Sequence, residues 1–373
     1  MLDDHQSKFE TCSACPSLCQ SACPVFSAEG NRTVSPWGLM QTLHQVQKKN
    51  LAFTPEIADL AYHCLTCGAC KEQCELNVDV LPILQDARIE AVKNEVAPKP
   101  ITGFLEKFHR HNNPFSKDLL YRLKEILPAK YFEKRTQVMY YATCTTISKT
   151  PEIIRDTFSL FEKLKIDFVG IYADPIQCCG YPLISAGAEA DFIDLAEINY
   201  HSFKKYKLII TGSPACAYTL KKTYAKYDMG LENRIVTINQ FLKPYLKNIN
   251  YKLKKSVRTK LMYHDPCYLS RHLGEVELPR EMIAQISGYQ PVEFLDNREK
   301  AGCSGQGGCY SVIEKETADS ITVKRLAEAY EKKIGTLVTQ CPSCVYKMRK
   351  NSKKIVVKDL ISYLNDSIEG LVE

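Results

Sequence analysis

The 373-residue chain has no run of about 18 consecutive apolar residues, the length that a membrane-spanning helix requires. Its first residues, MLDDHQSKFE, are charged and lack the apolar core of a secretory leader. The net charge is only +6, from 49 basic and 43 acidic residues, which does not require a nucleic-acid partner. These absences predict a cytoplasmic protein that stays in solution or lies peripherally on the inner face of the membrane.

The sequence also lacks a recognisable nucleotide-binding motif. The glycines of Gly305-x-Gly307-Gly308 have neither the strand-to-helix context nor the acidic ribose ligand of a dinucleotide site. We therefore expect that this chain binds no flavin and no NAD, and that electrons enter from a partner.

Cysteine, in contrast, is abundant, with 17 residues. In the reducing compartment expected for a chain without a leader, free thiols favour metal ligation over the disulfide framework of small secreted domains. Eight of them fall in two runs. The first contains Cys12, Cys15, Cys19 and Cys23, and the second contains Cys64, Cys67, Cys70 and Cys74.

The second run has the CxxCxxCxxxC spacing of two-cluster bacterial ferredoxins, and the first run differs by one extra residue between Cys15 and Cys19. The resemblance implies two [4Fe-4S] clusters whose fourth ligands are exchanged between the runs. One set, the Cys12 site, comprises Cys12, Cys15, Cys19 and Cys74. The other, the Cys64 site, comprises Cys64, Cys67, Cys70 and Cys23. Zinc, which also takes four thiolates, is the main alternative.

Helical periodicity in the N-terminal part predicts helices over 37–46, 57–62 and 80–93, before the proline pair at 98 and 100. Residues 98–135 are basic and rich in aromatic side chains. We expect a linker helix that packs its aromatic residues inward, the alternative being a surface for an anionic membrane or a partner protein.

From about residue 137, short β-branched runs alternate with helical stretches, a pattern typical of α/β units with parallel strands. The expected strands are 138–142, 167–172, 208–211, 260–264, 291–294 and 336–339. The expected helices are 153–164, 189–206, 217–227, 238–246, 279–287 and 317–334.

This half contains an internal repeat. VMYYATCTT at 138–146 is echoed by LMYHDPCYL at 261–269, and LIITGSPACAYTLKK at 208–222 by TLVTQCPSCVYKMRK at 336–350. Cys144 thus corresponds to Cys267, Cys178 to Cys303 and Cys216 to Cys344. The repeat predicts two similar lobes, related by a pseudo-twofold axis, that bring the carboxyl ends of their strands together, where open α/β sheets bind ligands.

The unit of Cys144, Cys178-Cys179-Gly180 and Ser213-Pro-Ala-Cys216 resembles the CCG motif of the heterodisulfide reductase family. In that family, five cysteines per repeat bind a non-cubane tetranuclear cluster. Joined to a two-cluster N-terminal half, the arrangement resembles the iron-sulfur subunits of glycolate oxidase, lactate-oxidising complexes and anaerobic glycerol-3-phosphate dehydrogenase.

The resemblance covers nearly all of the chain and implies a fold of the α plus α/β type. A helical ferredoxin-like domain with two [4Fe-4S] clusters would span 1–97, a linker 98–135, and two pseudo-symmetric α/β CCG lobes 136–255 and 256–373. One or two further [4Fe-4S] clusters, cubane or non-cubane, would lie in the CCG half.

Each lobe departs from the five-cysteine pattern by one position. Ser213 replaces a cysteine in the first lobe, which leaves the Cys144 site of Cys144, Cys178, Cys179 and Cys216. Ser304 replaces one in the second lobe, which leaves the Cys267 site of Cys267, Cys303, Cys341 and Cys344. Cys309 either supplies a replacement ligand or redox-active thiol, or is a small buried hydrophobic residue.

Three glycines, Gly180, Gly302 and Gly305, are expected to let the backbone approach a cluster closely. His264, in the HDPC stretch before Cys267, either orients the cluster loop through a hydrogen bond or donates a proton. Cys303 and His264 are therefore the candidate catalytic residues.

The leading hypothesis is an electron-transferring iron-sulfur subunit of a flavin-dependent dehydrogenase complex that oxidises a small hydroxy acid or glycerol-3-phosphate. Its partners would be a flavoprotein subunit and a quinone or a membrane-anchor subunit. Alternatively, the chain is itself a catalytic heterodisulfide reductase that cleaves a substrate disulfide at the CCG lobes. A third possibility is a redox-inert scaffold for docking, so whether the chain is an enzyme stays open.

Overall fold

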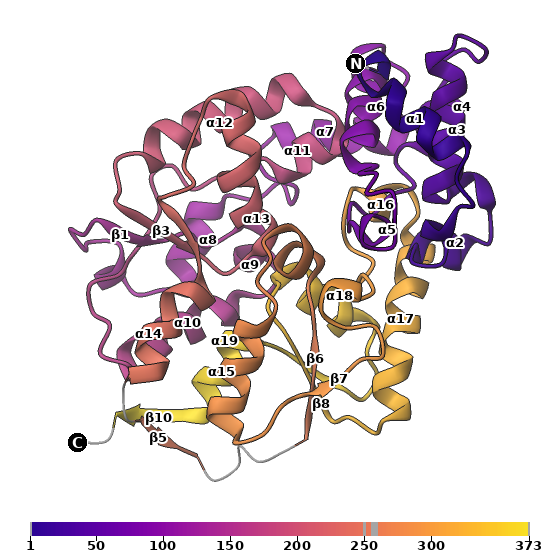
Figure 1. The fold of residues 1–373 in the computed structure, drawn as a ribbon. Coiled ribbons are helices and arrows are strands. Elements are labelled where there is room, and N and C mark those ends of the chain that lie inside the picture. Colours follow the sequence, from indigo (N-terminus) through magenta and orange to yellow (C-terminus); the bar gives the residue numbers. More distant parts are fainter. Residues whose placement is uncertain (1, 249–250, 255–259, 372–373) are drawn as a thin grey trace.

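The computed structural model describes residues 2–248, 251–254 and 260–371, so the predicted boundary between the lobes, at 255/256, lies outside the described residues. The chain forms an N-terminal helical region (residues 2–97), a helical connecting segment (98–135), a first lobe (136–248) and a second lobe (260–371) (Figure 1).

The N-terminal helical region consists of short helices around the two cysteine runs. They are α1 (Gln6–Ser13), α2 (Pro24–Glu29), α3 (Pro36–Gln47), α4 (Pro55–Leu60), α5 (Ala69–Glu72) and α6 (Leu81–Lys93), with 3-10 turns at Leu2–His5, Leu18–Gln20 and Arg32–Val34. The three predicted helices are confirmed as α3, α4 and α6. Ser35 caps α3 by accepting a hydrogen bond from the Gly38 amide at 3.0 Å, and Pro36 occupies the first helical position.

The connecting segment forms α7 (Lys99–His109), α8 (Leu119–Ile126) and a 3-10 turn (Ala129–Tyr131). The predicted inward packing of the aromatic residues is confirmed in part: Phe108 and Tyr131 are buried, and Phe104, Phe115 and Phe132 are partly buried. Tyr121 is 63% exposed, and its neighbour Leu120 is exposed as well.

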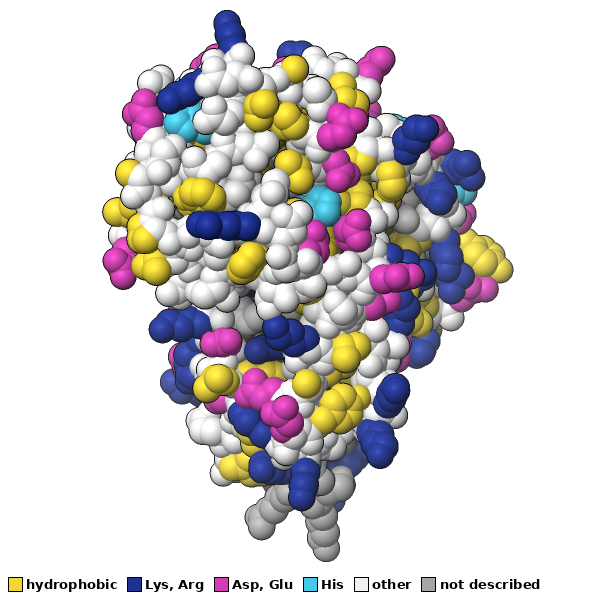
Figure 2. All heavy atoms as spheres, turned by 90° about the vertical axis from the view of Figure 1, so that its right-hand side faces the viewer, with side chains coloured by type: hydrophobic (Ala, Val, Ile, Leu, Met, Phe, Trp, Pro, Cys, Tyr) yellow, Lys and Arg dark blue, Asp and Glu magenta, His cyan; other side chains and the backbone are white. Residues whose placement is uncertain are grey.

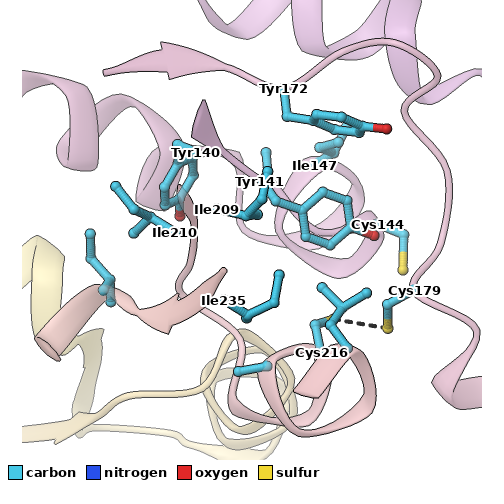
Figure 3. Packing of buried hydrophobic residues seen from close by; sticks show 14 of the residues in the cluster. Tyr140, Tyr141, Cys144, Ile147, Tyr172, Cys179, Ile209, Ile210, Cys216 and Ile235 are labelled. Carbon is cyan, nitrogen blue, oxygen red and sulfur yellow. Dashed lines mark hydrogen bonds between the residues drawn. The ribbon is translucent and has the colours of Figure 1, made fainter. Parts of the chain in front are cut away.

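The first lobe is built on a four-stranded parallel sheet in the order β2-β1-β3-β4. The strands are β1 (Val138–Tyr140), β2 (Gly170–Ile171), β3 (Leu208–Thr211) and β4 (Ile235–Thr237). The α-helices are α9 (Cys144–Lys149), α10 (Pro151–Lys163), α11 (Tyr181–Ala186), α12 (Glu189–Phe203), α13 (Pro214–Tyr218) and α14 (Ile238–Asn248). Figure 3 shows its core, where Tyr140, Ile209, Ile210 and Ile235 pack together.

The prediction of one helix over 217–227 is wrong in detail. The α-helix α13 ends at Tyr218, a π-helical turn follows at Thr219–Thr223, and a 3-10 turn spans Tyr224–Tyr227. The Tyr224 hydroxyl donates a hydrogen bond to the Cys179 carbonyl at 3.1 Å. π-helical turns are frequent next to functional sites, and this one places a buried side chain against a cysteine loop.

The second lobe repeats the first, with a parallel sheet in the order β7-β6-β8-β9. Its strands are β6 (Leu261–His264), β7 (Val292–Glu293), β8 (Thr336–Thr339) and β9 (Val356–Asp359). Its helices are α15 (Glu277–Ser287), α16 (Tyr310–Ile313), α17 (Lys315–Glu331), α18 (Pro342–Asn351) and α19 (Leu360–Ser367), with a π-helical turn at Tyr268–His272 and a 3-10 turn at Arg298–Lys300. The shared strand order agrees with the repeat found in the sequence.

Four strands were not expected from the sequence. They are β4 and β9, the fourth strand of each sheet, and the antiparallel pair β5 (Tyr251–Leu253) and β10 (Ile368–Leu371). All are short, and β4 and β9 run directly into helices, so no period-2 pattern develops in them.

The two lobes pack through α10 and α19, where the Asp156 carboxylate accepts hydrogen bonds from Ser362 Oγ and Asn365 Nδ2. The N-terminal helical region contacts both lobes. Tyr62 donates to the Ala186 carbonyl of the first lobe at 2.9 Å, and Cys67 accepts a hydrogen bond from Arg271 of the second lobe. Figure 1 shows this region beside α16 and α17.

Within the described residues, no helix has both the length and the apolar character needed to cross a bilayer. On the face shown in Figure 2, Lys and Arg side chains are interspersed with Asp and Glu.

Candidate metal centres

The Cys12 site is assembled as the ferredoxin-like spacing implies. Its four cysteines, Cys12, Cys15, Cys19 and Cys74, border a cavity of about 140 Å³ that Trp37 also lines. Burial raises the pKa of Cys12 to about 12, and the neighbouring thiolates of the same set contribute to this rise. The four thiols therefore lie close enough to one another to share one anionic group.

The Cys64 site is assembled in the same way. Cys23, Cys64, Cys67 and Cys70 line a second cavity in the N-terminal helical region. Burial raises the pKa of Cys23 to about 12, with contributions from the thiolates of Cys67 and Cys64. The structure thus groups Cys23 with the second run, the exchange that the ferredoxin pattern implies.

Arg88 is a fully buried cation beside the Cys64 site. Its guanidinium donates hydrogen bonds of 2.9 Å to the carbonyls of Ala61, Ser185 and Cys64. Among the described residues, Arg88 makes no ion pair with a carboxylate. Since an isolated buried charge is costly, the negative charge of a thiolate-ligated centre at this position would compensate it.

The Cys144 site lies at the carboxyl ends of β1, β2 and β3. Cys144 Sγ is 3.6 Å from Cys178 Sγ, and Cys179 Sγ is 3.2 Å from Cys216 Sγ, with all four side chains buried. Figure 3 shows the sulfurs of Cys144 and Cys179 on one side of the Tyr141 ring. Ser213 is buried beside Cys216, next to the set, at the position where the resemblance implies a fifth cysteine.

The Cys267 site is formed in the second lobe by the equivalent positions. Cys303 lies beside Cys267 and Cys344 beside Cys341, and in each pair the neighbouring thiol raises the pKa of the residue named first. Ser304 Oγ donates a hydrogen bond to Cys344 Sγ at 3.1 Å. The serine in each lobe therefore contacts the last cysteine of its own set.

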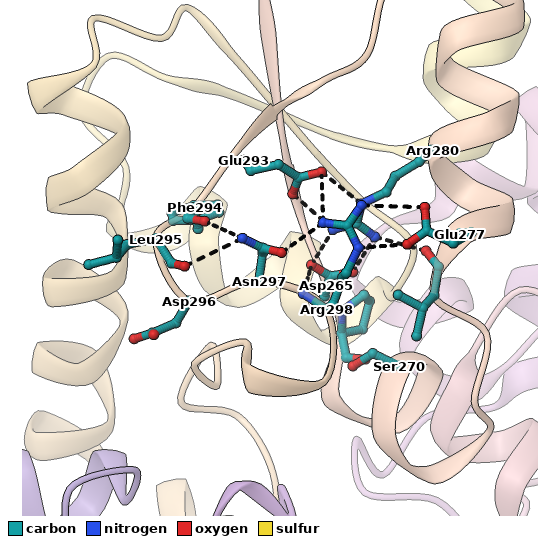
Figure 4. Close-up of polar contacts among 12 residues, drawn as sticks. Asp265, Ser270, Glu277, Arg280, Glu293, Phe294, Leu295, Asp296, Asn297 and Arg298 are labelled. Atoms are coloured by element: carbon teal, nitrogen blue, oxygen red, sulfur yellow. Dashed lines mark hydrogen bonds and ion pairs between the residues drawn. The ribbon is translucent and has the colours of Figure 1, made fainter. Parts of the chain in front are cut away.

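A buried ion-pair network supports the loops of the Cys267 site (Figure 4). Arg280 contacts both carboxylate oxygens of Asp265, at 2.7 and 2.8 Å, and also binds Glu293 at 2.7 Å. Asp265 in turn accepts a hydrogen bond from the Arg298 amide at 2.8 Å. One carboxylate thus holds the stretch before Cys267 and the start of the loop that leads to Cys303.

The glycines of the Cys303 loop lie in close packing contacts. A Cβ on Gly307 or Gly308 would lie 2.2 Å from a carbonyl oxygen of Leu65 or Cys64, respectively, so these two glycines let the second lobe approach the Cys64 loop. Gly305 has a φ of +89° and faces the Ala318 carbonyl, and Gly302 faces the Arg325 side chain. Gly180, with a φ of +88°, faces the ring of Phe192.

Cys309 lies apart from the second-lobe set. Its thiol donates to the Pro182 carbonyl of the first lobe at 3.7 Å, and burial raises its pKa to about 11. No described contact joins it to a cysteine of the Cys267 site, which favours the interpretation as a buried apolar residue.

The Cys64 site and the Cys267 site meet directly. Cys67 and Cys303 are packed in one buried cluster, and the adjacent Cys303 thiol, together with burial, holds the pKa of Cys67 well above its usual value. Arg271 spans the same contact: its Nε donates to the Cys67 carbonyl at 2.6 Å and its Nη1 to the Ala301 carbonyl at 2.7 Å. Its buried Nη2 has no hydrogen-bond partner in the described structure, so a cation with an unused donor lies among the thiols of two sites.

A second junction joins the loops of three sites. Thr66, inside the second cysteine run, lies with its hydroxyl 3.0 Å from the Tyr181 hydroxyl and 3.3 Å from that of Tyr268. Tyr181 follows the CCG triplet of the first lobe and Tyr268 follows Cys267, and their ring centroids are 5.2 Å apart. The aromatic pair fills the space where the two lobes and the N-terminal helical region come together.

His264 is buried, and its Nδ1 accepts a hydrogen bond from Arg325 Nε at 3.4 Å. Burial, together with the positive charges of Arg325 and Arg271, holds the pKa of His264 well below its usual value. A neutral imidazole is a poor proton donor, so the geometry favours the orienting role.

Sequence reasoning did not identify Arg88, Arg271 or Thr66 as parts of these sites. Thr66 could have been found from its place within a CxxC pair. The two arginines carry no such signal, because their function depends on burial that only the tertiary structure creates.

In the described part of the chain, no three His, Cys, Asp or Glu side chains are grouped tightly enough to hold a single metal ion. The thiols instead border two cavities in sets of four and meet in buried pairs in the lobes, with unpaired arginines beside them. This donor set fits iron-sulfur clusters, which are held by cysteine thiolates.

Comparison with known proteins agrees with the assignment of iron-sulfur clusters to these cysteine sets. The 4Fe-4S dicluster domain family matches residues 8–78, and the family described as "Cysteine-rich domain" (CCG) matches residues 138–221 and 261–349. The chain is 25% identical to a subunit of the dihydromethanophenazine:CoB--CoM heterodisulfide reductase of Methanosarcina barkeri, over 97% of this chain and 94% of that protein.

Two further relatives carry other names. One subunit of the fumarate reductase (CoM/CoB) of Methanothermobacter marburgensis is 26% identical over 94% of this chain and 70% of its own length. EtfAB:quinone oxidoreductase of Syntrophomonas wolfei is 24% identical over 77% of this chain and 43% of its own length. The chain is thus an iron-sulfur protein built of a 4Fe-4S dicluster domain and two cysteine-rich CCG domains, and its homologues are the heterodisulfide reductase subunit and related iron-sulfur oxidoreductases.

Proposed function

We propose that this chain is the electron-transferring subunit of an oxidoreductase complex, with electrons passing between the Cys12 site, the Cys64 site and the second lobe. A [4Fe-4S] cluster, when bound, takes up and releases single electrons at a potential set by nearby charges and hydrogen bonds. The observation that carries the proposal is the buried contact of Cys67 with Cys303, spanned by Arg271, which joins the N-terminal helical region to the second lobe.

The packing supports the order of the sites. Cys70 lines the cavities of both the Cys12 site and the Cys64 site, so these two sites are neighbours. The Cys12 site lies at the surface, where Leu18 and Leu76 are 46% and 55% exposed and line the same cavity. Exposed apolar side chains around a redox centre suit the docking of a protein partner, so we place electron entry at the Cys12 site.

The proposed donor is a flavoprotein dehydrogenase subunit that oxidises a small hydroxy acid or glycerol-3-phosphate, and the proposed acceptor is a quinone or a membrane-anchor subunit. The name EtfAB:quinone oxidoreductase, carried by one relative, supports quinone as an acceptor class. We propose a location at the inner face of the membrane and domain boundaries near residues 97, 135 and 255.

Iron and sulfide analysis of the anaerobically isolated chain tests the proposal, with Cys303→Ala compared against Cys309→Ala. C303A is expected to lose about four iron atoms, the content of one tetranuclear cluster, and to stop electron transfer beyond the Cys64 site. C309A should keep both. Equal iron content and equal transfer in the two variants would contradict the assignment.

Disulfide reduction by the chain itself is a second candidate. It is supported by relatives that are named as subunits of heterodisulfide reductases and that align over nearly the whole chain. Oxidation of a reduced dye that depends on an added disulfide, and that is lost in C303A but retained in C309A, would favour it. A dye oxidation rate that stays the same with and without each disulfide tested would eliminate it.

A further inference from the structure

A cavity of about 430 Å³ lies between the N-terminal helical region and the second lobe. Cys23 of the Cys64 site and Cys303 of the Cys267 site both border it, together with residues of α2, α5, α17 and the loop before Cys303. Its volume is within the range of about 300–1,000 Å³ that is usual for small-molecule sites. A small ligand in this cavity would lie beside two cysteine sites at once.

Arg325 is fixed in the wall of this cavity with one nitrogen unused. Its Nε donates to His264 and its Nη2 to the Asp296 carbonyl at 2.8 Å, while its guanidinium stacks 3.7 Å from the centre of the Phe294 ring. In the described structure its Nη1 makes no hydrogen bond and Arg325 makes no ion pair. Burial lowers the pKa of Arg325 to about 10, which leaves it charged at neutral pH.

Nη1 of Arg325 is also the atom closest to the position that a Cβ on Gly302 would occupy, at 3.5 Å. Since Gly302 has no side chain, the space between this guanidinium and the neighbouring Cys303 stays open. The unused donor and the thiol therefore face one cavity.

The lining holds three cations, Arg325, Lys300 and Lys324, and three carboxylates, of which one is paired with a lysine outside the lining. Lys300 is exposed and has no ion-pair or hydrogen-bond partner among the described residues, and Lys324 is bonded only to the Ser27 hydroxyl. Of the three acidic residues, Glu328 is paired with Lys332 at 2.6 Å. The side chains of Glu72 and Asp296 have no ion-pair or hydrogen-bond partner among the described residues, and that of Asp296 points away from the Arg280 network (Figure 4).

We propose that this cavity binds a small organic carboxylate, whose carboxylate is held by Arg325 and Lys300 and whose remaining part lies against Cys303. A guanidinium with a free N–H and a nearby ammonium are the groups that recognise a carboxylate through charge-assisted hydrogen bonds. The carboxylates of Glu72 and Asp296, which have no partner among the described residues, could accept a hydrogen bond from a hydroxyl group of the same ligand. The binding does not depend on the order of electron transfer proposed above.

Calorimetric titration of the anaerobically isolated full chain tests this proposal, with lactate and acetate as probes and lactamide as the uncharged match for lactate. We expect lactate to bind at least tenfold more tightly than lactamide. Arg325→Met and Lys300→Ala should each weaken lactate binding about tenfold, equivalent to about 1.4 kcal/mol. The control Lys315→Ala, at an exposed position outside the lining, should bind as the wild type does.

Lys300 is exposed, so K300A reports on the site even if R325M disturbs folding. Equal affinity for lactate and lactamide, unchanged binding in both lining variants, or no binding of either carboxylate would overturn the proposal. A change in the visible spectrum of the Cys267 site upon adding lactate, absent in K300A, would place the ligand beside Cys303. Failure of the electron-transfer proposal would leave the calorimetric result unaffected, so the two can be judged separately.

Discussion

Replacing Arg280 by methionine should destabilise the second lobe selectively. Arg280 and Asp265 are 1% and 2% exposed, and they form a two-point contact. Removing one partner of such a pair leaves the other charge buried and unpaired, at a cost of about 3–5 kcal/mol. Glu293 is 29% exposed, so its contact with Arg280 adds less.

The matched control for R280M is Arg298→Ala. The Arg298 side chain pairs with Glu277 at the surface, where the two are 40% and 55% exposed, and such pairs contribute about 0–1 kcal/mol. It approaches Glu293 of the Arg280 network only at 3.8 Å. The backbone amide that Asp265 holds is retained in R298A. The two variants therefore separate the buried network from the surface pair within the same loop.

Urea unfolding followed by iron release from the Cys267 site measures the effect. In R280M, iron of this site should be released at clearly lower urea, while release from the Cys12 and Cys64 sites follows the wild-type curve. A change in the free energy of unfolding of R280M below about 1 kcal/mol, no larger than for R298A, would refute the reasoning.

Three further predictions concern charges and hydrogen bonds near the sites. Arg271→Met should lower the reduction potential of the Cys64 site, by about 59 mV for each tenfold change in a one-electron equilibrium, whereas R271K should shift it less. Potentiometric titration followed by electron paramagnetic resonance measures the potentials of both variants. Equal shifts in the two would argue against a charge effect. Burial raises the pKa of Asp359 from 3.8 to about 8, so the folded state keeps a proton that the unfolded state releases, and stability should fall as pH rises from about 4 to about 8. Across this range the urea midpoint of unfolding should fall more in the wild type than in D359N. Parallel pH profiles of the two proteins would contradict the assignment. Ser304→Ala removes a hydrogen bond to the Cys344 sulfur and should lower the potential of the Cys267 site, since such hydrogen bonds raise it; an unchanged potential would show that this hydroxyl does not act on the site.

The parts of the sites that the sequence could predict are those encoded by local spacing. Cysteines two or three residues apart must lie in one loop, so three members of each set could be proposed from spacing, whereas the exchange of Cys74 and Cys23 was implied by the resemblance to two-cluster ferredoxins. The repeat, with Cys144 matched to Cys267, likewise predicted two α/β lobes with their cysteines at the carboxyl ends of parallel strands.

The relations between the regions could not be predicted in this way. The contact of Cys67 with Cys303 joins residues far apart in the chain, and no local pattern encodes it. Arg271 became relevant only because its side chain is buried at that contact. The close approach of the Leu65 carbonyl of the N-terminal helical region to Gly307, which the missing side chain permits, is likewise a contact between regions.

The proposed electron path depends most on the junction of Cys67 and Cys303, where the N-terminal helical region meets the second lobe. Low-temperature electron paramagnetic resonance of the fully reduced chain tests it directly, because unpaired spins on two nearby centres broaden or split each other's signals. We predict that the signal of the Cys64 site in the wild type is split by the second lobe as well as by the neighbouring Cys12 site, and that C303A removes the part due to the second lobe. Identical signals in C303A and in a wild-type sample whose second lobe retains its iron would contradict the proposed path.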